Sequence, residues 1–222
     1  MSAPHPTHRC RIVLVAPEIE DPDQQAATIA DALAGGDVAS VIVIARDADE
    51  RRAQARVAAV AKEAHARDVA VIVAGEARVA MRAGADGLHL EAAAVAELAQ
   101  AVEAAGGKIA VGADGARTRH DALELGEARP DYLFFGRFGY DTAPDPHPRN
   151  LALGEWWSEM VAIPCIVQAG ADLRGVAAVA ATGAEFVALS SAVFAGGSKP
   201  AEIVAQANAL LDAEAPRLEG AA

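Results

Sequence analysis

The sequence predicts an α/β protein of a single domain, folded as a (β/α)8 TIM barrel. Apolar runs alternate with helical segments along nearly the whole chain, and one helix-to-strand junction recurs. Residues 83–90 (AGADGLHL) and 182–189 (TGAEFVAL) each place a glycine and an acidic residue before an apolar run, and residues 128–136 form a weaker copy. Glycine commonly ends a helix because it adopts the left-handed conformation without steric cost. Such junctions belong to chains that alternate helices with parallel strands.

In the first half of the chain, the apolar runs stop at residues that break strands or end helices. Residues 11–17 are apolar on both faces and stop at Pro17, which is typical of a strand buried in a parallel sheet. A helix at 23–33 ends at the paired glycines 35 and 36. The remaining elements of this half are expected at 38–45, 49–67, 69–74, 76–83 and 87–90.

The second half repeats the alternation. A helix at 92–105 ends at the glycines 106 and 107, and a long proline-rich loop at 141–148 follows the sixth strand. The other elements are expected at 108–112, 119–127, 132–136, 153–160, 163–168, 173–181, 186–189 and 200–213. About eight strand–helix units close a TIM barrel, and the alternative is an open doubly wound sheet. The expected organisation is a flexible N-terminal tail at 1–10, the barrel at 11–214 and a C-terminal tail at 215–222.

The composition excludes several classes of partner. Nineteen basic against 31 acidic residues give a net charge of −12, and 53% of the residues are apolar. A chain of this kind folds around a large core and repels the phosphates of nucleic acids and anionic membranes. No apolar run approaches the roughly 20 residues of a membrane span. A small phosphorylated ligand in a locally basic pocket remains compatible with this charge.

Cysteine and tryptophan usage adds two expectations. Cys10 and Cys165 lack metal-binding spacing, and the first fourteen residues hold no signal-type apolar core, which predicts a cytoplasmic protein. Trp156 and Trp157 fall on the helix after the sixth strand. One of them is expected to pack inward, which leaves the other for a subunit contact in a homo-oligomer.

Candidate catalytic residues follow the strands, because the chemistry of a TIM barrel lies at the carboxyl ends of its strands. They are Arg46, His89, Asp114 and Arg137. His89 lies within a buried strand, where a hydrogen-bonded core histidine and a ligand contact are equally expected. Asp114 is either a general acid or base or a turn residue before glycine. Glu91 is the weak candidate for a metal ligand.

A phosphate site is predicted at the last two loops, with Gly170, Ser190 and Ser191 as its residues. These loops of TIM barrels often bind phosphate with backbone N–H groups and a helix N-terminus. Gly170 allows a close backbone approach, and Ser191 adds a hydroxyl donor. The alternative is a pair of tight turns with a serine N-cap. Asp141 and Gln168 also fall in loops at this end.

Four segments give the chain a resemblance to a known family. They are residues 83–90, 130–136 (PDYLFFG), 163–170 (IPCIVQAG) and 183–192 (GAEFVALSSA). In this order and spacing they resemble the thiamine phosphate synthases and their thiazole tautomerase (TenI) relatives. The resemblance implies a (β/α)8 barrel that joins hydroxymethylpyrimidine pyrophosphate to thiazole phosphate with Mg²⁺, releasing pyrophosphate and thiamine phosphate. The tautomerases need no metal.

The motifs that carry the family's chemistry are altered. Only Arg46 stands near the expected Gln-x-Arg-x-Lys, Ala74-Gly75 replaces Asn-Asp, and Glu91 followed by alanines replaces Gly-Gln-Glu-Asp. Residues 112–117 lack the Ser and His of Gly-x-Ser-x-His, and residues 141–144 lack the Lys of Thr-x-Thr-Lys. One carboxylate is a poor site for Mg²⁺. The monophosphate end is therefore retained better than the pyrophosphate end.

Two functions are compatible with this pattern. The first is a thiamine phosphate synthase-like transferase with degenerate catalytic motifs, which would use Mg²⁺ if active. The second is a non-catalytic or regulatory TIM barrel, TenI-like, that binds a phosphorylated ligand and has no cofactor. Arg46, Arg117 and Arg137 all follow strands, and because arginine binds phosphate bidentately they predict an anion-binding mouth. Arg137 stands where some tautomerases carry a catalytic histidine.

Overall fold

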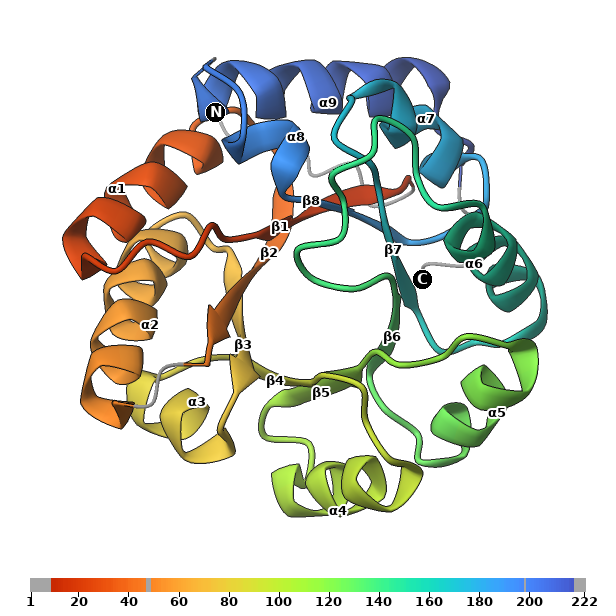
Figure 1. Cartoon of the computed structure of the whole chain (residues 1–222), viewed down its shortest axis with the longest axis horizontal. Helices are drawn as coiled ribbons and strands as arrows, with labels where there is room; N and C mark the ends of the chain where they lie inside the picture. The colour runs from red at the N-terminus through yellow and green to blue at the C-terminus, as the bar shows by residue number, and fades with distance from the viewer. Residues whose placement is uncertain (1–8, 47–48, 198, 218–222) are drawn as a thin grey trace.

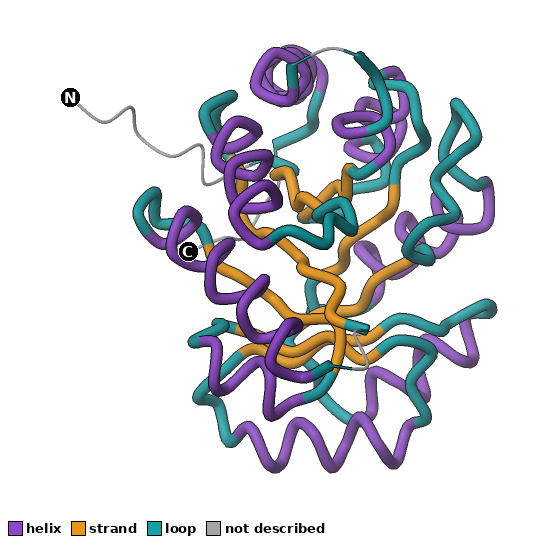
Figure 2. The backbone as a smooth tube through the Cα atoms, turned by 60° about the vertical axis from the view of Figure 1, so that its left-hand side comes forward, coloured by secondary structure: helices purple, strands orange, loops and turns teal. Residues whose placement is uncertain are grey.

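The computed structural model describes residues 9–46, 49–197 and 199–217, and within them eight parallel strands close into a barrel ringed by helices (Figure 1). The strands neighbour one another in chain order, and β8 (Phe186–Leu189) returns to pair with β1 (Arg11–Val15). In the turned view of Figure 2, the strands occupy the middle and the helices lie outside them. The predicted TIM barrel is confirmed, and the open sheet is excluded.

The elements follow the expected order closely. The other strands are β2 (Val38–Ala45), β3 (Ala70–Gly75), β4 (Gly87–Leu90), β5 (Ala110–Ala113), β6 (Tyr132–Phe135) and β7 (Cys165–Gln168). The helices are α1 (Pro22–Leu33), α2 (Glu50–His65), α3 (Ala77–Ala83), α4 (Val95–Ala105), α5 (Arg119–Glu127), α6 (Pro148–Met160), α7 (Arg174–Ala180), α8 (Ser191–Phe194) and α9 (Pro200–Glu214). Helix α6 begins five residues earlier than expected, because Pro148 opens it and the His147 ring accepts a hydrogen bond from the Arg149 N–H. The short α8 was not predicted.

The recurring acidic residue has a common structural role. Asp86, Asp131 and Glu185 each precede an even-numbered strand, and each carboxylate accepts a hydrogen bond from a backbone N–H of the preceding odd-numbered strand. The distances are 2.8 Å to Val71, 2.7 Å to Val111 and 2.9 Å to Cys165. The acidic residue of the repeat therefore satisfies a backbone group at the amino end of the barrel that would otherwise be buried without a partner.

The interior of the barrel is filled by alternate side chains of the strands, including Ile42, Ile72 and Phe134. The strand residues between them face the helices. Tyr132 fits inside because its neighbour across the sheet is Gly112, where a Cβ atom would stand 2.1 Å from the phenol ring. The barrel is thus a packed core and not a pore.

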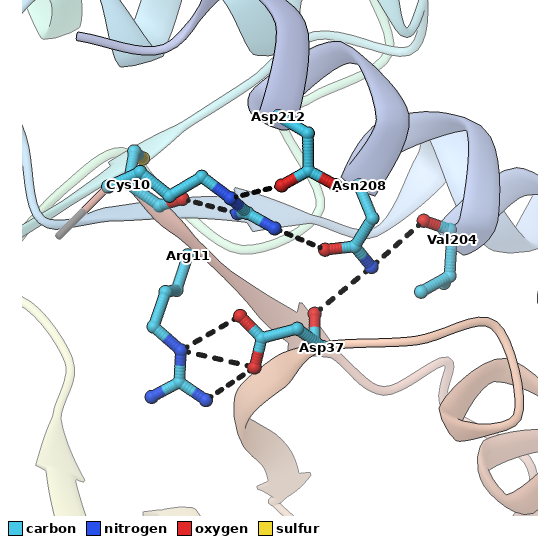
Figure 3. Close-up of polar contacts among 7 residues, drawn as sticks. Cys10, Arg11, Asp37, Val204, Asn208 and Asp212 are labelled. Atoms are coloured by element: carbon cyan, nitrogen blue, oxygen red, sulfur yellow. Dashed lines mark hydrogen bonds and ion pairs between the residues drawn. The ribbon is translucent and has the colours of Figure 1, made fainter. Parts of the chain in front are cut away.

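The N-terminal boundary differs from the expected one. Arg9 and Cys10, assigned above to a flexible tail, are buried. The Arg9 guanidinium donates to Asp212 at 2.8 Å and to Asn208 at 3.1 Å, and so ties the chain to α9. Figure 3 shows Asn208 in turn reaching the Asp37 carbonyl. The barrel therefore begins by residue 9, and residues 1–8 lie outside the described residues.

The tryptophan prediction is confirmed in part. Trp157 is fully buried, and Trp156 is half-buried with the Arg119 guanidinium 5.2 Å from its ring centroid. A homo-oligomer remains a prediction. In the part of the chain that the structure describes, no helix has the length and hydropathy needed to cross a bilayer.

Candidate active site

Arg46 and Glu91 form an ion pair at the mouth of the barrel. Arg46 follows β2 and Glu91 follows β4, and the guanidinium binds the carboxylate with two hydrogen bonds, one of them 2.8 Å from Nε to Oε1. Glu18 lies 3.6 Å from the same guanidinium. The hydrogen bonds that Arg46 donates to Glu91 are the main reason that the pKa of Arg46 is raised. Arg46 is thus cationic but already neutralised by carboxylates of the chain.

The metal prediction at Glu91 gains no support from this geometry, because its carboxylate is already bound to Arg46. Gly75, at the end of β3, lies close to the backbone of β2 and has no side chain that could bind a metal ion. Among the described residues, no group of three or more His, Cys, Asp or Glu side chains could hold a metal ion. Mg²⁺ at phosphate-transfer sites keeps several waters and binds one or two carboxylates together with substrate phosphates. The one carboxylate predicted for it, Glu91, is held by Arg46, so a metal site there remains a prediction.

His89 is a buried core histidine with one ring nitrogen that has no hydrogen-bond partner. Its side chain is buried inside the barrel, stacked on Tyr132, and its Nδ1 lies 2.9 Å from the Tyr132 hydroxyl. Burial raises the pKa of Tyr132, so the phenol stays protonated and can donate to Nδ1. The proton of a neutral imidazole then sits on Nε2, which has no hydrogen-bond partner. The nearest carboxylate, that of Asp114, lies 3.6 Å away.

Asp114 is buried and holds a turn in place. One carboxylate oxygen accepts a hydrogen bond from the Ala92 N–H, and Ala92 has a left-handed φ of 47°. The Asp114 carbonyl accepts another from Ala93 at 3.2 Å. These bonds fix the loop after β4 against the end of β5. Asp114 thus combines the turn role with a second oxygen that faces His89.

The three arginines that follow strands differ in their surroundings. Arg137 is exposed, with its guanidinium 4.1 Å from the centroid of the Tyr140 ring. Arg117 is exposed as well, and within the described residues its side chain makes no hydrogen bond or ion pair. Arg46 is held by Glu91. Of the three, only Arg46 is neutralised by a carboxylate of the described residues, and anion binding by Arg117 and Arg137 remains a prediction.

The Arg137 backbone reveals a second buried donor without a partner. Its N–H donates to Gln168 Oε1 at 2.7 Å, which fixes the orientation of the side-chain amide. Gln168 Nε2 is buried and unpaired. Buried polar atoms almost always have a hydrogen-bond partner. Gln168 Nε2 and His89 Nε2 therefore mark the carboxyl end of the barrel as a place where hydrogen-bond donors still lack an acceptor.

The predicted phosphate loops contact the segment between β6 and α6, residues 136–147, here called the β6–α6 loop. A Cβ atom on Gly170 would stand 2.3 Å from the Pro144 carbonyl, so the close approach that this glycine allows is to the chain's own loop. The Ala171 N–H donates to Ala143 at 2.7 Å, and the Ser191 N–H donates to the Asp141 carboxylate at 2.7 Å. Gly170 and Ser191 both contact the β6–α6 loop, and phosphate binding by Gly170, Ser190 and Ser191 remains a prediction.

Phe138 was not identified from the sequence. This loop residue is buried, and its ring centroid lies 5.0 Å from both His89 and Phe134. A phenylalanine in a polar loop carries no periodic signal, so its insertion into the barrel could not be predicted. Tyr132, in contrast, could have been placed beside His89 from the inward-facing alternation of its strand.

A closed parallel barrel with its polar groups gathered at the carboxyl ends of the strands is the architecture of TIM-barrel enzymes. The family model described as thiamine monophosphate synthase matches residues 12–193. The chain belongs to this family.

Two relatives support the family assignment, and two solved structures share the fold. The chain is 33% identical over 207 residues to a thiamine-phosphate synthase of Rhodospirillum centenum, covering 91% of this chain and 98% of the relative. It is 31% identical over 217 residues to one of Hyphomonas neptunium, covering 93% and 96%. Thiamine phosphate pyrophosphorylase from Pyrococcus furiosus superposes with a TM-score of 0.76 at 19% identity over 93% of this chain and 98% of that one. GGGPS from Thermoplasma volcanium, with a TM-score of 0.65 at 17% identity over 94% and 93%, shares the fold alone.

Proposed function

We propose that this protein binds thiazole phosphate, or the product thiamine phosphate, at the carboxyl ends of β7 and β8, and that it is a weak thiamine phosphate synthase. The observation that carries the proposal is the family match over residues 12–193, which includes the loops at Gly170 and Ser190-Ser191. Backbone N–H groups bind phosphate in such loops. These positions keep the small residues that a backbone site needs.

Weak activity follows from the charge of the leaving group. Joining hydroxymethylpyrimidine pyrophosphate to thiazole phosphate releases pyrophosphate, whose charge must be matched by cations or a metal. Arg46 is already paired with Glu91, so neither its charge nor the Glu91 carboxylate is free for the pyrophosphate or for the Mg²⁺ that the family uses. His89 Nε2 remains as a neutral donor that can bind an acceptor atom of a substrate. Loss of one electrostatic group commonly lowers the rate about 10²- to 10³-fold.

A coupled assay for thiamine phosphate, with and without Mg²⁺, tests the proposed activity. We expect slow but detectable formation of thiamine phosphate, far below that of the Rhodospirillum centenum relative, which serves as the positive control; no product at all favours the non-catalytic candidate below. Ordinary enzymes turn over at about 1 s⁻¹ or faster. Such a rate with Mg²⁺ would contradict the proposed weak activity.

The second candidate function is a non-catalytic or regulatory binder of the same phosphorylated ligands. The Arg46–Glu91 pair favours it, because it blocks both the cation and the carboxylate that catalysis would use. Calorimetry with thiamine phosphate in the absence of Mg²⁺ separates the two: tight metal-free binding without turnover identifies a binder. We place either function in the cytoplasm, where Cys10 and Cys165 stay reduced.

A further inference from the structure

The β6–α6 loop fills the mouth of the barrel with the chain's own side chains. In Figure 1 it crosses the centre of the ring on its way from β6 toward α7 and α8. Asp141 from this loop binds the Ser191 N–H, and the Ala143 and Pro144 carbonyls bind the N–H groups of Ala171 and Asp172 at 2.7 and 3.1 Å. Three backbone donors at the ends of β7 and β8 are therefore occupied from within.

Asp141 occupies its position at a cost. Its side chain is 6% exposed, and within the described residues the Ser191 N–H is its one hydrogen-bond partner, with no cation in salt-bridge range. A carboxylate buried without a cation loses its hydration and regains little of it from a single N–H group. The Ser191 N–H thus provides a donor for an anion, while the Asp141 carboxylate is only weakly stabilised there.

Phe138 occupies a second position three residues earlier. Its ring is 3% exposed and packs on His89 and Phe134. One of the two buried donors without a partner lies here, because His89 Nε2 belongs to the ring against which Phe138 packs. A phenyl ring offers the His89 donor no acceptor, whereas a heteroaromatic ring would.

We propose that the β6–α6 loop is an autoinhibitory occupant of the site, in which Asp141 takes the place of a ligand's phosphate and Phe138 that of its aromatic ring. The ligand class is then a heteroaromatic ring joined to a phosphate by a short linker, which deepens the proposed function and rests on it. Binding requires the loop to leave, so that the Asp141 carboxylate returns to water. The apparent affinity is lowered by the small fraction of molecules with the loop open.

Asp141→Ala tests the proposal, with Asp145→Ala as the matched control. Asp145 is an exposed carboxylate of the same loop, so both variants lose one charge of the same size but only one loses the Ser191 contact. Calorimetry with thiamine phosphate and with inorganic phosphate should give about tenfold tighter binding for Asp141→Ala and a change below about twofold for the control. Hydrogen exchange without ligand should be faster at the Ser191 amide and in the loop for Asp141→Ala.

The outcomes separate this proposal from the proposed function. Weaker or unchanged binding of both probes by Asp141→Ala, or unchanged exchange in the loop, overturns the autoinhibition. If inorganic phosphate binds more tightly but thiamine phosphate does not bind at all, the autoinhibition stands and the proposed ligand is wrong. Should Asp141→Ala fold poorly, Asp141→Asn keeps the shape and removes the charge, and it should show the same changes to a smaller extent.

Discussion

The two ends of the barrel satisfy their polar groups in opposite ways. At the amino end, Arg11 binds Asp37 through two nitrogens, and Asn208 links Asp37 to α9 (Figure 3). At the carboxyl end, His89 Nε2 and Gln168 Nε2 are buried without partners. Buried polar groups that are fully paired stabilise a fold, whereas unpaired ones are retained where a ligand completes them. The amino end thus maintains the barrel, and the two unpaired donors support our proposal that a ligand binds at the carboxyl end.

The largest effect is expected at the amino end, for Asp131→Ala. This change removes the acceptor of the Val111 N–H, a buried backbone group, and should lower the free energy of unfolding by about 2–3 kcal/mol, because a hydrogen bond to a charged group is lost and the donor stays buried. Urea denaturation followed by circular dichroism measures this. Asp145→Ala is the control and should stay within about 0.5 kcal/mol of the wild type. Equal effects of the two variants would mean that the acidic residue of the repeat has no structural role.

A smaller effect is expected inside the barrel, for Tyr132→Phe. Loss of the hydroxyl leaves His89 Nδ1 unpaired and should lower the free energy of unfolding by about 1–2 kcal/mol. It should also release the imidazole from the tautomer with its proton on Nε2, which ¹⁵N NMR of labelled histidine detects. An unchanged tautomer in the variant would show that Tyr132 does not position His89, whatever the change in stability.

The smallest effect is expected at the mouth, for Arg46→Ala. The Arg46–Glu91 pair is partly exposed, with Arg46 half-exposed, so its loss should change the free energy of unfolding by less than about 1 kcal/mol. The variant also frees the Glu91 carboxylate. We expect millimolar Mg²⁺ to leave the Tm of both proteins unchanged. A Tm that rises with Mg²⁺ in the variant alone would identify Glu91 as a metal ligand that Arg46 blocks.

Much of the fold was determined by the sequence alone. The strands at 38–45, 87–90 and 186–189 and the helix at 119–127 have the expected bounds, because apolar runs and turn residues act over a few neighbouring positions. Gly84 and Gly183 have φ values of 72° and 81°, the left-handed conformation that the recurring junction requires. Local chemistry of this kind can be identified in the printed sequence.

The tertiary structure alone decided which partners the polar groups have. Nothing near Arg46 in the sequence indicates that Glu91, 45 residues away, neutralises it. Asp141 binds Ser191 across 50 residues, and Phe138 enters the barrel from a loop without periodicity. These pairings depend on how the ends of separate strands meet when the barrel closes. The sequence therefore determined the strands and the loops that follow them, and the closure of the barrel decided that the β6–α6 loop binds the loops after β7 and β8.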